Sequence, residues 1–276
     1  MLKRKKMFLW AGLLALSMLA ACNSSVAPIL SLNQQVESAE ANAAEIVITD
    51  TDETNADMGA ASVVDAAAAN SKTHDDEADY TWDSAAVIPI VLNGDSIAAD
   101  GEGVTVDGST ATITSAGTYS LSGTLVDGQI IVDTEDEDIV RLILNGVDIG
   151  NSTSAPINIV SAEETMIVLA DGTDNYITDG DSYVFADPDE DEPNAAIFSK
   201  SDLTLSGSGS LTVDAHYNDG IASKDGLIIA DGTITVNAAD DGLRGKDYLI
   251  VKNGNITIDA QGDGLKSDNE DDTQCH

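Results

Sequence analysis

The sequence predicts an all-β fold built as a parallel solenoid, with about three short strands in each coil. Three Asp-Gly pairs, Asp219-Gly220, Asp241-Gly242 and Asp263-Gly264, each begin a similar phrase and follow one another at intervals of 22 residues. Short runs of Val, Ile, Leu and Thr are separated by Gly, Asn and Asp about every eight to twelve residues, as strands and turns require. In a solenoid, the equivalent residues of successive coils stack into ladders.

The apolar phrases favour this architecture over an antiparallel sandwich of hairpins. A sandwich needs only alternating inward residues, whereas here whole phrases recur in register, such as 234–236 and 256–258. We therefore expect like residues to stack on like, with Ile221, Leu243 and Leu265 in one inward column. The strands expected upstream of these phrases are residues 104–106, 111–114, 119–122, 129–132, 140–144, 157–160, 166–169, 203–205 and 211–213.

The N-terminus has the pattern of an export signal. Basic residues at 3–6 precede an apolar run, 7–18, that is too short for a typical transmembrane helix, and Leu19-Ala20-Ala21-Cys22 resembles the bacterial lipobox. We predict that residues 1–22 are a lipoprotein signal peptide and that Cys22 is lipidated, which would anchor an exported protein to the bacterial membrane on its periplasmic or cell-surface side. The alternative is a chance cysteine in a signal that is simply cut.

The remaining chain divides at about residue 85. Residues 23–85 are rich in Ala, Ser, Asn and Asp and lack a sustained apolar period, which predicts a disordered acidic and Ala-rich tether, with a short helix at 66–69 as the alternative. Residues 86–276 are expected to form the solenoid, with a surface loop at 187–194. Because the sequence stops without a further apolar run that could cap the last coil, we expect a fragment of a longer protein.

The charge balance limits the partners. Only 12 Lys and Arg oppose 49 Asp and Glu, a formal net charge of −37. Nucleic acid is therefore an unexpected partner, because its binding depends on the neutralisation of phosphates by Lys and Arg. Bound calcium would reduce this acidic charge, and we expect a monomer.

A column of acidic side chains is the strongest candidate for a metal site. Stacked corners bring carboxylates to contact distance, and a dense set of oxygen ligands suits calcium. The alternative is that these residues only form turns, because Asp-Gly is a common corner pair. The candidate metal ligands are Asn218, Asp219, Asp225, Asp240, Asp241, Asp247 and Asp263.

Basic residues follow each acidic corner and have two possible roles. They could be ion-pair partners of the aspartates, or they could line a groove for acidic sugars in which Arg244 grips a carboxylate. The candidate carbohydrate-binding residues are Tyr217, Lys224, Arg244, Lys246 and Lys266. With a single His in the repeat region, neither a His-based zinc site nor a Ser-His-Asp triad is expected.

Several phrases resemble a bacterial family of carbohydrate-binding β-helix proteins described from a cellulolytic clostridium. The resemblance runs from about residue 80 to the end and is carried by residues 127–133, 142–147, 194–200, 217–221, 239–247 and 262–269. It implies a right-handed parallel β-helix similar to that of pectate lyases, with calcium bound on coils of about 22 residues. It also implies the binding of cellulose and of acidic sugars such as polygalacturonate, without an established lyase activity.

The first hypothesis is therefore a calcium-binding, non-catalytic surface lipoprotein whose partner is a polysaccharide. The second is a calcium-dependent polysaccharide lyase in which Arg244 or a lysine abstracts the proton next to a uronate carboxylate. Such a base needs a lowered pKa, which the many surrounding carboxylates oppose. The third is a structural adhesin or biofilm component held together by calcium.

Overall fold

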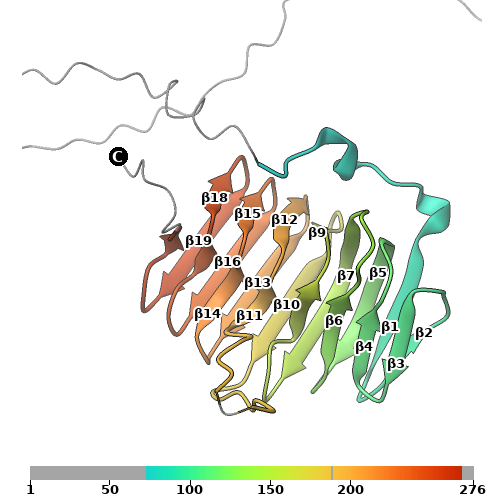
Figure 1. The fold of residues 1–276 in the computed structure, drawn as a ribbon, viewed down its shortest axis with the longest axis horizontal. Coiled ribbons are helices and arrows are strands. Elements are labelled where there is room, and N and C mark those ends of the chain that lie inside the picture. The colour runs from blue at the N-terminus through green and yellow to red at the C-terminus, as the bar shows by residue number, and fades with distance from the viewer. Residues whose placement is uncertain (1–72, 188, 269–276) are drawn as a thin grey trace, which may run out of the picture. The chain divides into compact units, whose positions relative to one another are not determined.

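The computed structural model describes residues 73–187 and 189–268, which are almost entirely β-structure (Figure 1). Two short 3-10 helices, η1 (Glu77–Tyr80) and η2 (Ser84–Ala86), precede the first strand. Within these ranges, no helix is long and apolar enough to cross a membrane. The predicted signal peptide, Cys22 and the tether up to residue 72 lie outside the described residues.

Twelve strands form the larger sheet. They are β1 (Ile88–Gly94), β2 (Ile97–Ala99), β5 (Gly117–Leu125), β7 (Val140–Asn151), β9 (Glu164–Leu169), β10 (Asp174–Asp179), β12 (Asp202–Gly207), β13 (Ser210–Ala215), β15 (Gly226–Ile229), β16 (Thr233–Ala238), β18 (Tyr248–Val251) and β19 (Asn255–Ala260). Their order is β18-β15-β12-β9-β7-β10-β13-β16-β19, and β5 joins β7 to β1, which also pairs with β2.

Eight strands form the second sheet, in the order β20-β17-β14-β11-β8-β6-β4-β3. They are β3 (Val104–Asp107), β4 (Thr110–Ile113), β6 (Gln129–Asp133), β8 (Ile157–Ser161), β11 (Ala195–Ser199), β14 (Asp219–Ser223), β17 (Leu243–Gly245) and β20 (Leu265–Lys266). This sheet is mixed, because β3 and β4 are antiparallel whereas the other pairs are parallel.

The predicted right-handed parallel β-helix, a solenoid with about 22 residues per coil, is wrong. The structure instead has a curled, mainly parallel sheet and a second, mixed sheet, and both begin with antiparallel pairs, β1–β2 and β3–β4. The larger sheet is continuous around its bend because the long strands β5 and β7 run through it. Gly123 and Gly146 lie at the bend with positive φ angles of 98° and 73°, which glycine tolerates without a steric cost.

The stacking of the repeated phrases is confirmed. Ile221 lies opposite Leu243, which lies opposite Leu265, and Val213 and Val236 are partners in the same way. These side chains point between the two sheets, where all but Leu265 are fully buried. Each such burial contributes about 1.5–3 kcal/mol to folding, so the matched phrases supply the core.

Residues 73–86, here called the strap, precede β1 and lie along the larger sheet (Figure 1). The His74 backbone N–H donates to the Tyr248 hydroxyl at 2.9 Å, and Nε2 of His74 lies 2.8 Å from Oγ1 of Thr204. Specific contacts therefore begin at His74, upstream of residue 86, where we expected the folded domain to begin.

The strap covers the outer face of strands β9, β12 and β15. Thr204 on β12 lies between its strand partners Met166 and Ile228, and all three are about 99% or more buried although they point away from the main core. Lys252 forms an ion pair with Asp75 of the strap, with 2.7 Å between the charged atoms. This face of the sheet is closed by the chain itself.

Candidate functional site

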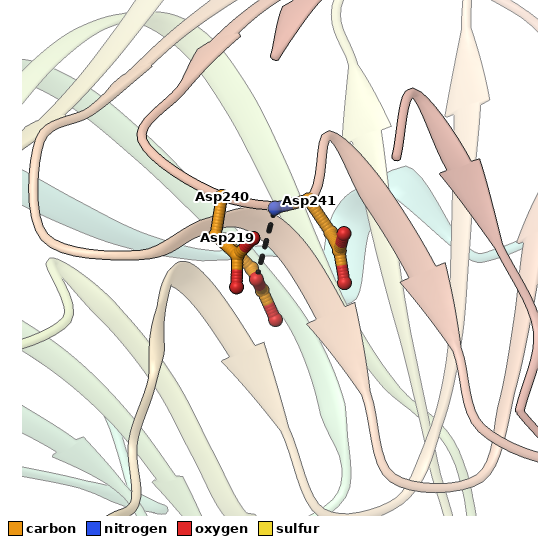
Figure 2. Close-up of side chains that lie close together, drawn as sticks. All are labelled: Asp219, Asp240 and Asp241. Carbon is orange, nitrogen blue, oxygen red and sulfur yellow. Dashed lines mark hydrogen bonds between the residues drawn. The ribbon is translucent and has the colours of Figure 1, made fainter. Parts of the chain in front are cut away.

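Three aspartates, Asp219, Asp240 and Asp241, form the acidic corner where the chain enters β14 and β17. Figure 2 shows the three side chains next to one another at this corner, and one ligand oxygen from each lies within 4.8 Å of the others. The repeated corner brings them together, because the Gly220 N–H donates to the Asp241 carbonyl and the Gly242 N–H donates to the Asp263 carbonyl, each at 2.8 Å. The 22-residue register therefore superimposes the acidic residues.

Asp219 is the least solvated member of the corner, with only 1% of the residue exposed. Its Oδ1 accepts hydrogen bonds from the Asp241 backbone N–H and the Asn218 amide, each at 3.2 Å. Its Oδ2 is buried and has no hydrogen-bond partner, although Nη1 of Arg244 lies 3.5 Å away. Burial raises the pKa of Asp219 to about 6, because the charged form loses hydration that the corner replaces only in part.

Asp241 is 3% exposed and has partners on both oxygens. Its Oδ1 accepts from the Asp263 backbone N–H at 2.8 Å, and its Oδ2 forms an ion pair with Nζ of Lys266 at 2.7 Å. A Cβ added at Gly262 would come within 2.5 Å of Oδ1 of Asp240 and 2.7 Å of Oδ1 of Asp241. Because residue 262 is a glycine, a space remains beside these two carboxylates that any side chain would otherwise fill.

The other predicted metal ligands divide between two places. Asn218 and Asp263 adjoin the acidic corner through the hydrogen bonds described above. Asp225 and Asp247 lie before β15 and β18, where their backbones are hydrogen-bonded to each other at 3.1 Å. Burial and the nearby charge of Asp202 raise the pKa of Asp225. The structure therefore assembles three of the seven candidates into one cluster, with two more beside it.

Three of the predicted sugar-binding cations are engaged in ion pairs. Arg244 contacts Asp268 at 2.7 Å, Lys224 contacts Glu192 at 2.5 Å, and Lys266 contacts the acidic corner. This pattern agrees with the ion-pair alternative. Lys246 is exposed on the loop after β17, and Tyr217 stacks on Tyr183 with ring centroids 4.1 Å apart. The ring of Tyr217 therefore has one face covered by protein.

A groove of about 310 Å³ adjoins the acidic corner and was not predicted from the sequence. It is lined mainly by polar residues near the ends of β13, β16 and β19, including Asp214, His216, Asn237, Asp259 and Gln261. The sequence pattern that could have revealed this groove is the set of polar residues at 214, 237 and 259. Each stands near the end of a run in which apolar and polar residues alternate.

Comparison with known proteins gives the family. A family model described as "Carbohydrate-binding domain-containing protein" matches residues 107–275, which include the acidic corner and the groove. The chain belongs to this family of carbohydrate-binding domain proteins. A curated family relative from Acetivibrio thermocellus is 47% identical over 150 residues, which are 54% of this chain and 52% of the relative. The chain spans about half the length of that carbohydrate-binding relative.

A solved structure is also similar to this carbohydrate-binding domain protein. It is described as a polysaccharide lyase-like protein from C. thermocellum, in a gadolinium derivative. The two are 44% identical with a TM-score of 0.66, and the match covers 68% of this chain and 76% of the other. The resemblance inferred from the sequence is thereby confirmed as membership of the carbohydrate-binding domain family, which has a relative in a clostridium, whereas calcium binding stays a prediction.

Proposed function

We propose that this protein binds polysaccharide and that the acidic corner holds a calcium ion which contributes to that binding. The observation that carries the metal proposal is the buried Oδ2 of Asp219, which lacks a hydrogen-bond partner beside two further carboxylates. A buried carboxylate oxygen without a hydrogen bond is costly, the ion pair with Arg244 at 3.5 Å offsets that cost only in part, and a divalent cation would compensate for the rest. Family membership supports a glycan as the ligand.

The donor set fits a hard cation. Calcium takes six to eight oxygen ligands at about 2.3–2.6 Å, from carboxylates, backbone carbonyls and water. Asp219 and Asp241 would hold the ion from the buried side, whereas Asp240 is exposed and would leave the outer side open. A calcium ion held here would supply positive charge, which would attract the carboxylates or hydroxyls of a sugar.

Lyase chemistry is the alternative activity, and the description of the similar structure as polysaccharide lyase-like favours testing it. A lyase needs a base that can lose its own proton. Hydrogen bonding to Asp268 raises the pKa of Arg244, and hydrogen bonding to Asp241 raises the pKa of Lys266. Both shifts oppose proton abstraction, so binding without cleavage is the better supported function.

Purified protein incubated with polygalacturonate in calcium or in EDTA tests both activities. Retention of the protein on the polymer in calcium, with loss of retention in EDTA and in an Asp219→Asn variant, is the expected result. An exposed Asp107→Asn variant on β3 is the matched control for the loss of one charge. A rise in ultraviolet absorbance from unsaturated sugar product would overturn the non-enzymatic proposal. Unchanged retention in EDTA would overturn the role of the metal.

The location is also part of the proposal. Cys22 of the lipobox-like sequence would carry the lipid, and the protein would face the periplasm or the cell surface. A Cys22→Ser variant should then move from the membrane fraction to the soluble fraction after expression of the full sequence. Equal membrane retention of the variant would contradict the lipid anchor.

A further inference from the structure

The curled larger sheet has two outer faces, one on each side of its bend, and the second sheet has a third. Within the described residues, other segments of the chain cover two of these three faces. The strap covers the face of β9, β12 and β15. On the second sheet, the outward residues Phe198 and Ala222 are buried in a small cluster against Tyr183, which belongs to the segment between β10 and β11. The third face, formed by the second half of β7 together with β10, β13, β16 and β19, has no such cover and is exposed.

A single row of outward residues crosses this third face and continues onto β5 and β1. We call it the polar row, because six of its members are polar and the seventh is a tyrosine. Each member is the direct strand partner of the next one. In spatial order they are Asn93, Thr124, Asp148, Tyr176, Thr212, Thr235 and Thr257.

The members of the row face outward: five of them are exposed, and Thr212 and Thr235 are half-buried. On β16, Thr235 points outward between the buried Ile234 and Val236, and on β13 Thr212 does so between Leu211 and Val213. Tyr176 is 47% exposed, which is unusual for a large ring on a strand and leaves part of it accessible to a ligand. The row therefore combines hydroxyl groups with one exposed aromatic ring.

The spacing of the row suits a sugar polymer. Neighbouring strands lie about 4.8 Å apart, so the row presents one side chain at each step over roughly 29 Å. That step is close to the length of one pyranose unit in an extended β-1,4-linked chain. A glycan lying across the strands would meet an equivalent side chain at each sugar, and the parallel register maintains this match along the row.

The charge of the face favours a neutral sugar. Of the seven residues in the row, only Asp148 is an acidic residue, and none is basic. The groove at its edge carries Asp214 and Asp259, which would repel a polyanion. Asn237 between them donates to Asp214 at 2.6 Å, so this edge presents oxygen acceptors to the hydroxyl groups of a sugar.

His216 adds an oriented acceptor at the same edge. Its Nδ1 lies 3.1 Å from the backbone carbonyl of Asp179, which can only accept a hydrogen bond, so in the neutral imidazole Nδ1 carries the proton. Nε2 then has a free lone pair. The side chain is half exposed and lines the groove, where a sugar hydroxyl could donate to it.

We infer that the polar row is the docking surface for a neutral polysaccharide chain that runs across the strands, with Tyr176 as its aromatic contact and His216 as an acceptor at its edge. The inference rests on the proposed polysaccharide-binding function and assigns it a second surface, separate from the acidic corner. The acidic corner contributes through its metal, whereas the row contributes hydroxyl hydrogen bonds and stacking. Binding at the row is therefore independent of calcium.

Microcrystalline cellulose is the neutral probe and polygalacturonate is the acidic one, each used in pull-down with the purified full chain. Tyr176→Ala and Thr235→Arg should each weaken cellulose binding by about tenfold, the effect of one lost anchor contact. EDTA and Asp219→Asn should leave cellulose binding unchanged. Thr105→Arg, at an exposed position on β3 of the other sheet, is the matched control and should bind as the unmodified protein does.

The outcomes separate this inference from the proposed function. If the unmodified protein binds polygalacturonate but not cellulose, or if both variants of the row bind cellulose normally, the inference is wrong and the function stands. If the unmodified protein binds neither polymer, the proposed function itself fails. Should Thr235→Arg unfold, Thr257→Arg at the exposed end of the row replaces it, and normal cellulose binding by that variant would overturn the inference equally.

Discussion

Calcium at the acidic corner makes a quantitative prediction for thermal stability. An ion that binds only the folded state stabilises it by about 2.7 kcal/mol at a concentration 100 times its dissociation constant. For a domain of this size, that energy raises the melting temperature by about 5–10 °C. We expect this rise when calcium is added to metal-free protein at pH 7.5, as measured by calorimetry or circular dichroism.

The sign of the pH dependence follows from Asp219. Burial raises the pKa of its carboxyl group to about 6, compared with an ordinary value near 4 in the unfolded chain. Without metal, the stability contributed by this group is fully present below pH 4 and is lost as the pH rises to about 6. The difference corresponds to about 3 kcal/mol. Calcium needs the ionised carboxylate, so its stabilising effect should be large above pH 6 and disappear below it.

Two variants make the test specific. Asp219→Asn removes the buried charge, so it should abolish both the calcium shift and the part of the stability change between pH 4 and 6, about 3 kcal/mol, that Asp219 contributes. Asp107→Asn removes an exposed charge on β3 and should leave both intact. An equal calcium shift in the Asp219→Asn variant, or no shift in the unmodified protein, would refute the reasoning.

Three further predictions concern the strap and the core. His74→Ala removes the ring contacts to the hydroxyls of Thr204 and Tyr248, while the backbone N–H of residue 74 can still donate to Tyr248, so the free energy of unfolding in urea should fall by about 1–3 kcal/mol and limited proteolysis should cut the strap faster; unchanged proteolysis would contradict the role of His74 in holding the strap. Burial raises the pKa of Glu164 to about 7, so its contribution to stability should decline as the pH rises from about 4 to 7, and Glu164→Gln should remove that slope from the urea midpoints. Ile221→Ala should cost about 2–5 kcal/mol in urea unfolding, because the side chain is fully buried, and a smaller loss would show that the stacked strands can collapse around the cavity.

The repeated phrases carried the most reliable structural information. Positions 22 residues apart, such as Ile221 and Leu243, were correctly expected to pair, because identical corners and alternating apolar residues allow only one parallel register. The same register explains why Asp219 and Asp241 meet. The regular coil was wrong, since the bend in β5 and β7 depends on two glycines, and their sequence context resembles that of an ordinary turn.

Contacts between distant segments could not be predicted from the sequence. His74 lies in a polar stretch without apolar periodicity, and its partners, Thr204 and Tyr248, are 130 and 174 residues away. The ion pairing of Lys224 with Glu192 was foreseen only as a type of interaction, because the acidic partner belongs to a loop outside the repeat. Local spacing identifies strand partners, whereas loop and strap contacts depend on how the chain returns across the sheets.

The docking of the strap has a consequence for the order of assembly. Its anchor, Tyr248, begins β18, at one edge of the larger sheet, whereas the strap itself precedes every strand. Closing a loop of 174 residues is entropically unfavourable until the intervening strands have paired. During synthesis the strap therefore leaves the ribosome early but has no complete binding surface until β18 has been made, so its engagement reports that the strands up to β18 have paired.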